Sequence, residues 1–233
     1  MSSGLSKKRD LDAGDIEVRR DALPPLPDDI LNRPGSGYFD LRALFPEPTR
    51  PIELEIGSGK GTFLLKAAAS DPSTNFFAME HAYEFHLYAA DRVRRAGLKN
   101  VKMMCCDATE FLRWRCPTGI LRVVHLYYSD PWPKAKHHKN RVVQHEFLRQ
   151  CHRVLAPGGE LRVVTDHPAL WQWDLDHFAR VTAPAAAAPL FEVRPFEPPS
   201  WTTDEEVIGT NYEHKTRAAG WVPNSAVLVK LGP

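Results

Sequence analysis

From residue 51 onward, short apolar runs alternate with stretches of helical periodicity. This alternation is typical of βαβ units and a largely parallel sheet. The expected strands are residues 51–56, 75–80, 100–105, 121–128 and 160–165. The expected helices are residues 61–70, 82–96, 108–115, 142–155 and about 168–181. The pattern therefore predicts an α/β fold with a mostly parallel central sheet and helices on both faces.

The two ends of the chain depart from this alternation. Segments 190–195 and 225–231 predict a C-terminal antiparallel strand pair, and the stretch 200–220 predicts a loop with a short helix. Residues 1–34 carry clustered charges and several prolines but no sustained apolar period, so we expect a mobile N-terminal tail. Residues 35–233 are expected to form a single domain.

Composition excludes several classes of protein. The longest apolar runs are far shorter than the roughly 18 residues of a membrane span, and no secretory leader is recognisable, so we expect a cytoplasmic protein without a membrane partner. The four cysteines lack zinc-ligand spacing, so we expect no metal. The formal net charge is +1, and any nucleic-acid partner must therefore be held by a local basic patch.

A glycine-rich turn with Gly57, Gly59 and Gly61 lies directly between an expected strand and an expected helix. Glycine lets the backbone approach a ligand closely at such a position. The turn lacks the G-x-x-x-x-G-K-[ST] spacing of a phosphate-binding loop and the G-x-G-x-x-G spacing of a dinucleotide site. Its shorter spacing favours S-adenosylmethionine, although a purely structural turn is the alternative.

Carboxylates stand at or near the ends of four successive expected strands: Glu55, Glu80, Asp107 and Asp130. Ligands of open parallel sheets bind outside the carboxyl ends of the strands, so these side chains are expected to face one crevice. Glu80 is placed to accept from ribose hydroxyls, and Asp107 from an adenine amino group. The alternative is that Asp107 only caps the helix at residue 108 and that Glu80 is a solvated strand end.

The loop that follows the fourth expected strand combines a rigid carboxylate with a basic cluster. Pro131 and Pro133 flank Trp132 and restrict the backbone next to Asp130, which makes Asp130 a candidate for the reaction centre. The fixed positive charges that follow are Lys134, Lys136, Lys139 and Arg141. Such a cluster next to a tryptophan is suited to RNA phosphates and bases, and an ordinary solvated loop is the alternative.

Together, six motifs resemble the bacterial tRNA (guanine-N7-)-methyltransferases of the TrmB family over about residues 40–230. The motifs are LEIGSGKG at 54–61, FFAMEH at 76–81, CDA at 106–108, SDPWPKAKHHKNR at 129–141, VVTDH at 163–167 and TNYEHK at 210–215. The resemblance implies a Rossmann-like class I methyltransferase fold and S-adenosylmethionine contacts at Glu55, Glu80, Asp107 and Asp130. It also implies tRNA contacts at Lys134, Asp166, Thr210, Asn211, Tyr212 and Glu213.

The activity implied by the resemblance is methyl transfer to N7 of guanine in tRNA, at the variable-loop guanosine, position 46 in tRNA numbering. A monomer or homodimer is expected. Contacts with tRNA phosphates are expected at Lys136, Lys139 and Arg141. Two features depart from the family pattern: Asn140 replaces a basic residue, and the charged tail has no counterpart.

Two other functions are alternatives to this one. An adenine-amino methyltransferase would carry [DN]-P-P-[YFW] after the fourth strand, but Trp132 and Pro133 stand in the reverse order. A non-catalytic RNA-binding module would be expected to lose the cofactor carboxylates, which are all present. Glu213 also has two interpretations, because Thr210 and Glu213 match a helix-capping box as well as a site that reads the Watson–Crick edge of guanine.

Overall fold

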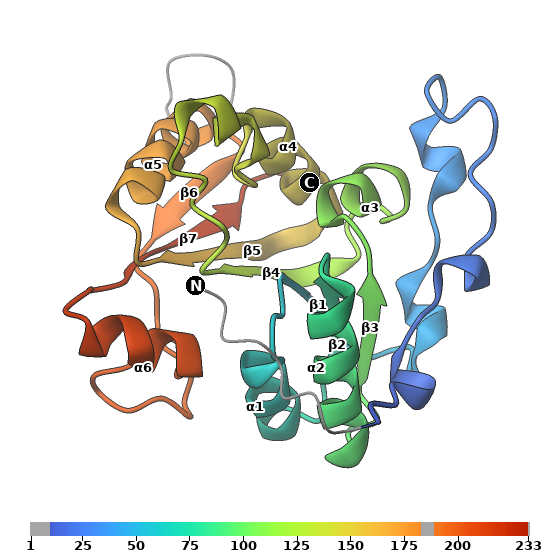
Figure 1. Cartoon of the computed structure of the whole chain (residues 1–233). Coiled ribbons are helices and arrows are strands. Elements are labelled where there is room, and N and C mark those ends of the chain that lie inside the picture. The colour runs from blue at the N-terminus through green and yellow to red at the C-terminus, as the bar shows by residue number, and fades with distance from the viewer. Residues whose placement is uncertain (1–9, 183–188, 233) are drawn as a thin grey trace.

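A computed structural model describes residues 10–182 and 189–232, which form a sheet of seven strands covered by helices (Figure 1). The order across the sheet is β3-β2-β1-β4-β5-β7-β6. The strands are β1 Ile52–Ile56, β2 Asn75–Glu80, β3 Val101–Cys105, β4 Leu121–Tyr127, β5 Leu155–Thr165, β6 Phe191–Arg194 and β7 Asn224–Lys230. Strands β1 to β5 are parallel, and β7 runs antiparallel between β5 and β6. The predicted α/β fold with a C-terminal antiparallel pair is confirmed.

Helices cover both faces of the sheet (Figure 1). Side chains of β1 such as Leu54 pack with the helices on one face, and those of β2 such as Ala78 pack with the helices on the other. The first face is covered by α3 Ala108–Trp114, α4 His145–Val154 and α5 Pro168–Thr182. The second is covered by α1 Thr62–Ser70 and α2 Tyr83–Arg95. Burial on both faces explains why the parallel strands are nearly continuous apolar runs.

The helix expected over 142–155 begins later than predicted, at His145. Gln144 has an extended backbone, and its side-chain amide donates to the carbonyl oxygens of His138 and Arg141, both at 3.2 Å. These bonds keep the preceding residues in the loop that follows β4. Strand β5 is correspondingly longer than expected, because it starts immediately after α4.

The described part of the N-terminal segment lies along β3 and α2. The Val18 amide donates to the Met103 carbonyl at 2.7 Å, and Glu17 accepts from the buried His86 ring at 3.0 Å. Ile16 and Leu23 are buried against the domain. The expectation of a mobile tail over 1–34 did not anticipate these contacts, because the apolar residues that make them stand singly among charges. Residues 1–9 of that segment lie outside the described part of the chain.

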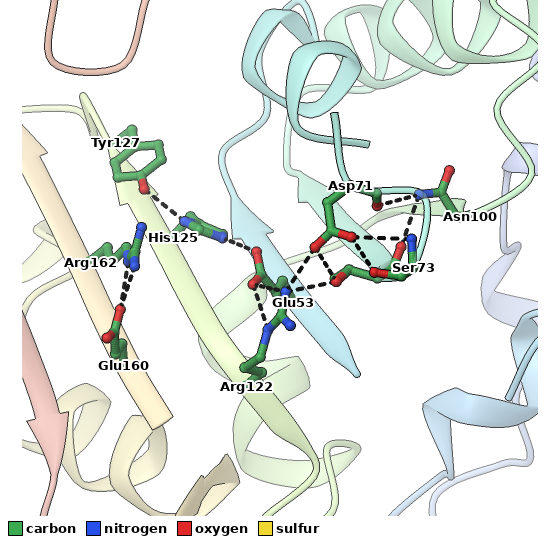
Figure 2. A network of polar contacts seen from close by, with 10 residues as sticks. Glu53, Asp71, Ser73, Asn100, Arg122, His125, Tyr127, Glu160 and Arg162 are labelled. Atoms are coloured by element: carbon green, nitrogen blue, oxygen red, sulfur yellow. Dashed lines mark hydrogen bonds and ion pairs between the residues drawn. The ribbon is translucent and has the colours of Figure 1, made fainter. Parts of the chain in front are cut away.

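A buried polar network fastens β1 to β4 (Figure 2). Glu53 accepts from Arg122 at 2.9 Å, and its other carboxylate oxygen lies 2.8 Å from Nε2 of His125. Nδ1 of His125 lies 2.7 Å from the hydroxyl of Tyr127. Glu53 and Glu55 are two residues apart on β1 and therefore share a face of the strand. The network around Glu53 thus also fixes the strand that carries Glu55. Its contribution is therefore to hold the central strands in register below the candidate site.

Candidate active site

The glycine turn after β1 has a backbone that only glycine adopts readily. Gly57, Gly59 and Gly61 have φ values of 76°, 52° and 68°. No atom lies within 4 Å of the position that a Cβ would take at Gly57 or Gly59, whereas a Cβ at Gly61 would lie 2.9 Å from Cβ of Ala89. The first two glycines therefore border open space suited to a ligand, and the third allows α1 and α2 to pack closely.

Two glutamates stand beside this turn. Glu80 at the end of β2 accepts from the Gly59 amide at 2.8 Å and from the Ala82 amide at 2.9 Å. Glu55 is buried, and its Oε2 has no hydrogen-bond partner among the described residues. Burial, reinforced by the nearby charge of Glu80, raises the pKa of Glu55 to about 8. A buried carboxyl group without a partner is suited to a cationic ligand group.

Asp107 caps α3, as the structural alternative for this residue predicted. Its Oδ1 accepts from the Thr109 amide at 2.8 Å, the Thr109 hydroxyl at 2.6 Å and the Glu110 amide at 3.2 Å. Burial acts to raise the pKa of Asp107, but these hydrogen bonds hold it below its usual range. Capping uses one carboxylate oxygen of Asp107, which is an exposed residue, and Oδ2 forms no hydrogen bond with other described residues, so the two roles of Asp107 are compatible.

The chain leaves β4 through two residues with positive φ that are not glycine. Tyr128 has φ 54° and Trp132 has φ 41°. Strained backbone of this kind costs about 1–3 kcal/mol per residue and is common at functional sites. Asp130 lies between them with an exposed side chain. The sequence indicated a stiff loop here from its prolines but gave no sign of these two conformations.

Helix α6, Asn211–Ala218, stands next to the carboxyl end of β4 (Figure 1). The ring of Tyr212 lies 5.0 Å from the ring of Tyr128, and 52% of Tyr212 is exposed. Burial and the charges of Asp166 and Asp130 raise the pKa of Tyr212. Tyr212, which the resemblance assigns to a tRNA contact, therefore packs against Tyr128, just beyond the end of β4 and two residues before Asp130.

Two buried groups at this edge were not identified from the sequence. The Tyr128 hydroxyl and the Ser58 hydroxyl are both buried without a hydrogen-bond partner among the described residues. Ser58 lies between two glycines of the turn, which was its only signal in the sequence. Unpartnered polar atoms near the carboxyl ends of the strands are candidates for ligand contacts.

Recognition of guanine requires a carboxylate that is open to the substrate, but the Glu213 carboxylate is enclosed by the protein. It is fully buried, and its carboxylate accepts from the amides of Val207, Ile208 and Gly209 at 2.5, 2.8 and 2.9 Å. Arg217 donates to the same carboxylate at 3.2 Å. Burial acts to raise the pKa of Glu213, and these donors hold it below its usual range. Of the two interpretations of this residue, the contacts support the structural one.

Thr210 also has a capping role, because its hydroxyl accepts from the Glu213 amide at 3.1 Å. The Glu213 carboxylate accepts from the amides of residues 207–209 and not from the Thr210 amide, so only the Thr210 half of the predicted capping box forms. The carboxylate instead forms a clasp around the preceding loop. The side chain of Asn211 lies outside the described part of the structure.

The basic cluster divides into exposed and buried members. Lys134, Lys136 and Lys139 are exposed on and beside the 3₁₀ helix η5, Ala135–Asn140. Arg141 is only 4% exposed and donates to the Pro131 carbonyl at 3.0 Å. The sequence predicted a phosphate contact at Arg141. The structure differs, because the guanidinium is buried and bonds to other parts of the protein. Sequence alone did not distinguish the four charges.

The fold and the glycine turn beside acidic strand ends define a class I S-adenosylmethionine-dependent methyltransferase. Solved structures share this fold: the 16S rRNA methyltransferase KamB has a TM-score of 0.54 at 17% identity, covering 90% of this chain and 96% of that one. TrmN from Thermus thermophilus has a TM-score of 0.51 at 22% identity, covering 78% of this chain and 45% of that one.

Sequence comparisons identify the family within this class of methyltransferases. Residues 49–219 match the model of a family described as putative methyltransferase. A tRNA (guanine-N(7)-)-methyltransferase of Agrobacterium fabrum is 34% identical over 218 residues, 93% of this chain and 89% of the relative. One of Rhizobium meliloti is 35% identical over 182 residues, 78% of this chain and 75% of the relative. The chain belongs to the tRNA (guanine-N7-)-methyltransferase family.

No helix in residues 10–182 or 189–232 is long and apolar enough to cross a membrane. Within the same residues, no group of three or more histidine, cysteine or acidic side chains is placed to hold a metal ion.

Proposed function

We propose that this enzyme transfers a methyl group from S-adenosylmethionine to N7 of a guanine in tRNA, at the variable-loop guanosine, position 46. The observation that carries the proposal is the juxtaposition at the end of β4, where Asp130 is followed directly by the exposed Lys134, Lys136 and Lys139. A cofactor crevice with acidic strand ends thereby adjoins a basic surface suited to RNA phosphates. The names of the relatives from Agrobacterium and Rhizobium support the same substrate.

The cofactor is assigned to the crevice at the carboxyl ends of β1 to β4. Open space at Gly57 and Gly59 admits it, and the unpartnered oxygen of Glu55 and hydroxyl of Ser58 offer polar contacts. We assign Glu80 to the ribose, Asp107 to the adenine and Asp130 to the reacting end of the cofactor, because ligands of open parallel sheets bind outside the carboxyl ends of the strands. Gly61 contributes through helix packing, which keeps the turn in place.

The main contribution of the protein to this reaction is to position guanine N7 in line with the sulfonium methyl group. N7 of guanine has a free lone pair and no proton, so no general base is required for its attack on the sulfonium methyl group. Holding the reactants in line supplies on the order of 7–11 kcal/mol of barrier reduction. The purine gains positive charge as the bond forms, and the Asp130 carboxylate stabilises that charge. The exposed ring of Tyr212 offers a surface for base stacking beside it.

Methyl transfer from labelled S-adenosylmethionine to bulk tRNA, followed by nucleoside analysis, tests the proposal. We expect the label in 7-methylguanosine, and we expect a transcript with adenosine at position 46 to accept none. Label in another nucleoside would contradict the reaction, and undiminished labelling of the altered transcript would contradict the position.

Replacing Lys134, Lys136 or Lys139 with alanine is expected to weaken tRNA binding. Each lost phosphate contact should flatten the slope of log affinity against log salt concentration by about one unit or less. Lys99→Ala is the matched control, because Lys99 is equally exposed but precedes β3 at the opposite edge of the sheet. Slopes that are the same for all four variants and the wild type would mean that the loop is merely solvated.

Cofactor affinity is expected to depend on pH through Glu55. Its pKa of about 8 means that the carboxyl group is protonated at neutral pH, whereas a cationic ligand favours the ionised form. Binding should therefore release a proton, and affinity should rise about tenfold per pH unit below pH 8 and level off above it. Calorimetric titration from pH 6 to 9 measures this, and Glu55→Gln should remove the dependence due to this group. Equal pH profiles for the two proteins would refute the assignment.

A further inference from the structure

We propose that Arg141 is a positioning residue: it holds the Pro131–Trp132 peptide, and with it Asp130, in the geometry that methyl transfer requires. This inference rests on the proposed function of Asp130. It assigns to a member of the basic cluster a role inside the enzyme rather than on RNA.

The guanidinium of Arg141 joins the loop after β4 to helix α5. Nε donates to the Pro131 carbonyl at 3.0 Å, and Nη1 donates to the Ala169 carbonyl in the first turn of α5 at 3.4 Å. The guanidinium carbon lies 5.0 Å from the ring centroid of Trp173, and the Trp173 indole N–H is held by the Val143 carbonyl at 2.7 Å. The loop after β4 is thereby braced against α5.

The braced peptide is the one next to the backbone strain. The Pro131 carbonyl belongs to the peptide bond that precedes Trp132, whose φ is 41°. A residue before proline normally has an extended backbone, and Trp132 precedes Pro133. Strained conformations persist only where their surroundings hold them, and the bond from Arg141 is a direct restraint on this one. Asp130 is one residue away from the held carbonyl.

The environment of Arg141 suits a fixed internal charge. Asp174 on α5 is 1% exposed, and its Oδ1 has no hydrogen-bond partner among the described residues. Burial raises the pKa of Asp174 to about 7, and the positive charge of Arg141 opposes that rise. A planar guanidinium that bonds two carbonyls and stacks on an indole cannot be replaced by a lysine ammonium. Arg141→Lys therefore keeps the charge and removes the brace.

The test compares Arg141→Lys with Lys139→Ala in the full chain. For Arg141→Lys we expect kcat to fall at least tenfold, with KM for tRNA within about twofold and the salt slope of tRNA binding unchanged. Hydrogen exchange should increase in residues 129–141 and not in β1 or β2. For Lys139→Ala we expect a flatter salt slope and wild-type hydrogen exchange in residues 129–141, because Lys139 is exposed and makes no contact with the Pro131 carbonyl. A flatter slope with normal kcat in Arg141→Lys would overturn the proposal.

A second variant keeps the test informative if Arg141→Lys folds poorly. Trp173→Phe retains an aromatic face beneath the guanidinium and loses the bond to Val143, so a smaller loss of kcat and a smaller gain in exchange over 129–141 are expected. Wild-type exchange in that segment would overturn the proposal. Because exchange is measured without tRNA, it remains decisive even if the wild-type enzyme fails to methylate tRNA, which is how failure of the proposed function would show.

Discussion

Asp130→Ala is expected to lower turnover of tRNA methylation about 10²-fold or more while the protein stays folded. Removing one preorganised electrostatic group from a reaction centre typically costs this much. The side chain is exposed at the end of β4 and forms no hydrogen bond with other described residues, so its loss leaves no internal partner unsatisfied. The effect should therefore appear in kcat and not in the melting temperature.

Two variants separate charge from shape in this experiment. Asp130→Asn keeps the size of the side chain and removes its charge, so it should lose nearly as much turnover as Asp130→Ala. Asp176→Asn is the control, since Asp176 is an exposed acid on α5 away from the strand ends, and its activity should match the wild type. Near-normal turnover in a folded Asp130 variant would remove this residue from the reaction centre.

The sequence predicted the sheet well because both faces of its strands are buried. An apolar run such as residues 75–80 has no polar face that could be confused with a helix, and the turn at Gly57 marks the end of the strand before it. The N-terminal contacts were not predicted. Ile16 and Val18 are single apolar residues among charges, and only β3 and α2 in the folded domain give them something to pack against.

For the candidate site, the sequence predicted where the backbone positions lie in the fold but not how their side chains are used. Parallel strands bring their carboxyl ends to one edge, so the neighbourhood of Glu55 and Glu80 followed from order alone. The burial of Arg141 could not be predicted, because it depends on Trp173 and Ala169, about thirty residues away in the sequence. Local sequence shows that a charge is present but does not show which side chain turns inward.

The use of the Glu213 side chain could not be predicted from local sequence either. Its motif is compatible with a helix cap and with recognition of guanine, and both uses require a carboxylate at the same position. The deciding contacts are the three backbone amides of residues 207–209, which face the carboxylate because the loop before α6 folds around it. Lys66 of α1 fixes that loop further by donating to the Gly209 carbonyl at 2.6 Å.

Glu213→Gln is accordingly expected to destabilise the protein by about 2–4 kcal/mol. The amide replaces one charged acceptor with an NH₂ donor that faces backbone N–H groups, and each buried polar group left unsatisfied costs about 1–3 kcal/mol. For a chain of this size the melting temperature should fall by about 5–10 °C, measured by calorimetry. Glu205→Gln, at an exposed position in the same loop, should leave it unchanged.

The pH dependence distinguishes this role of Glu213 from substrate recognition. Because its pKa is lowered in the folded state, the stability it provides is present above its unfolded pKa of roughly 4.3 and is lost as the pH falls through the folded pKa. The difference in unfolding free energy between wild type and Glu213→Gln should therefore shrink in that acid range, since the protonated carboxyl group resembles the amide. A variant with wild-type stability at every pH and no tRNA methylation would instead make Glu213 a reader of guanine, and the clasp around residues 207–209 would be dispensable.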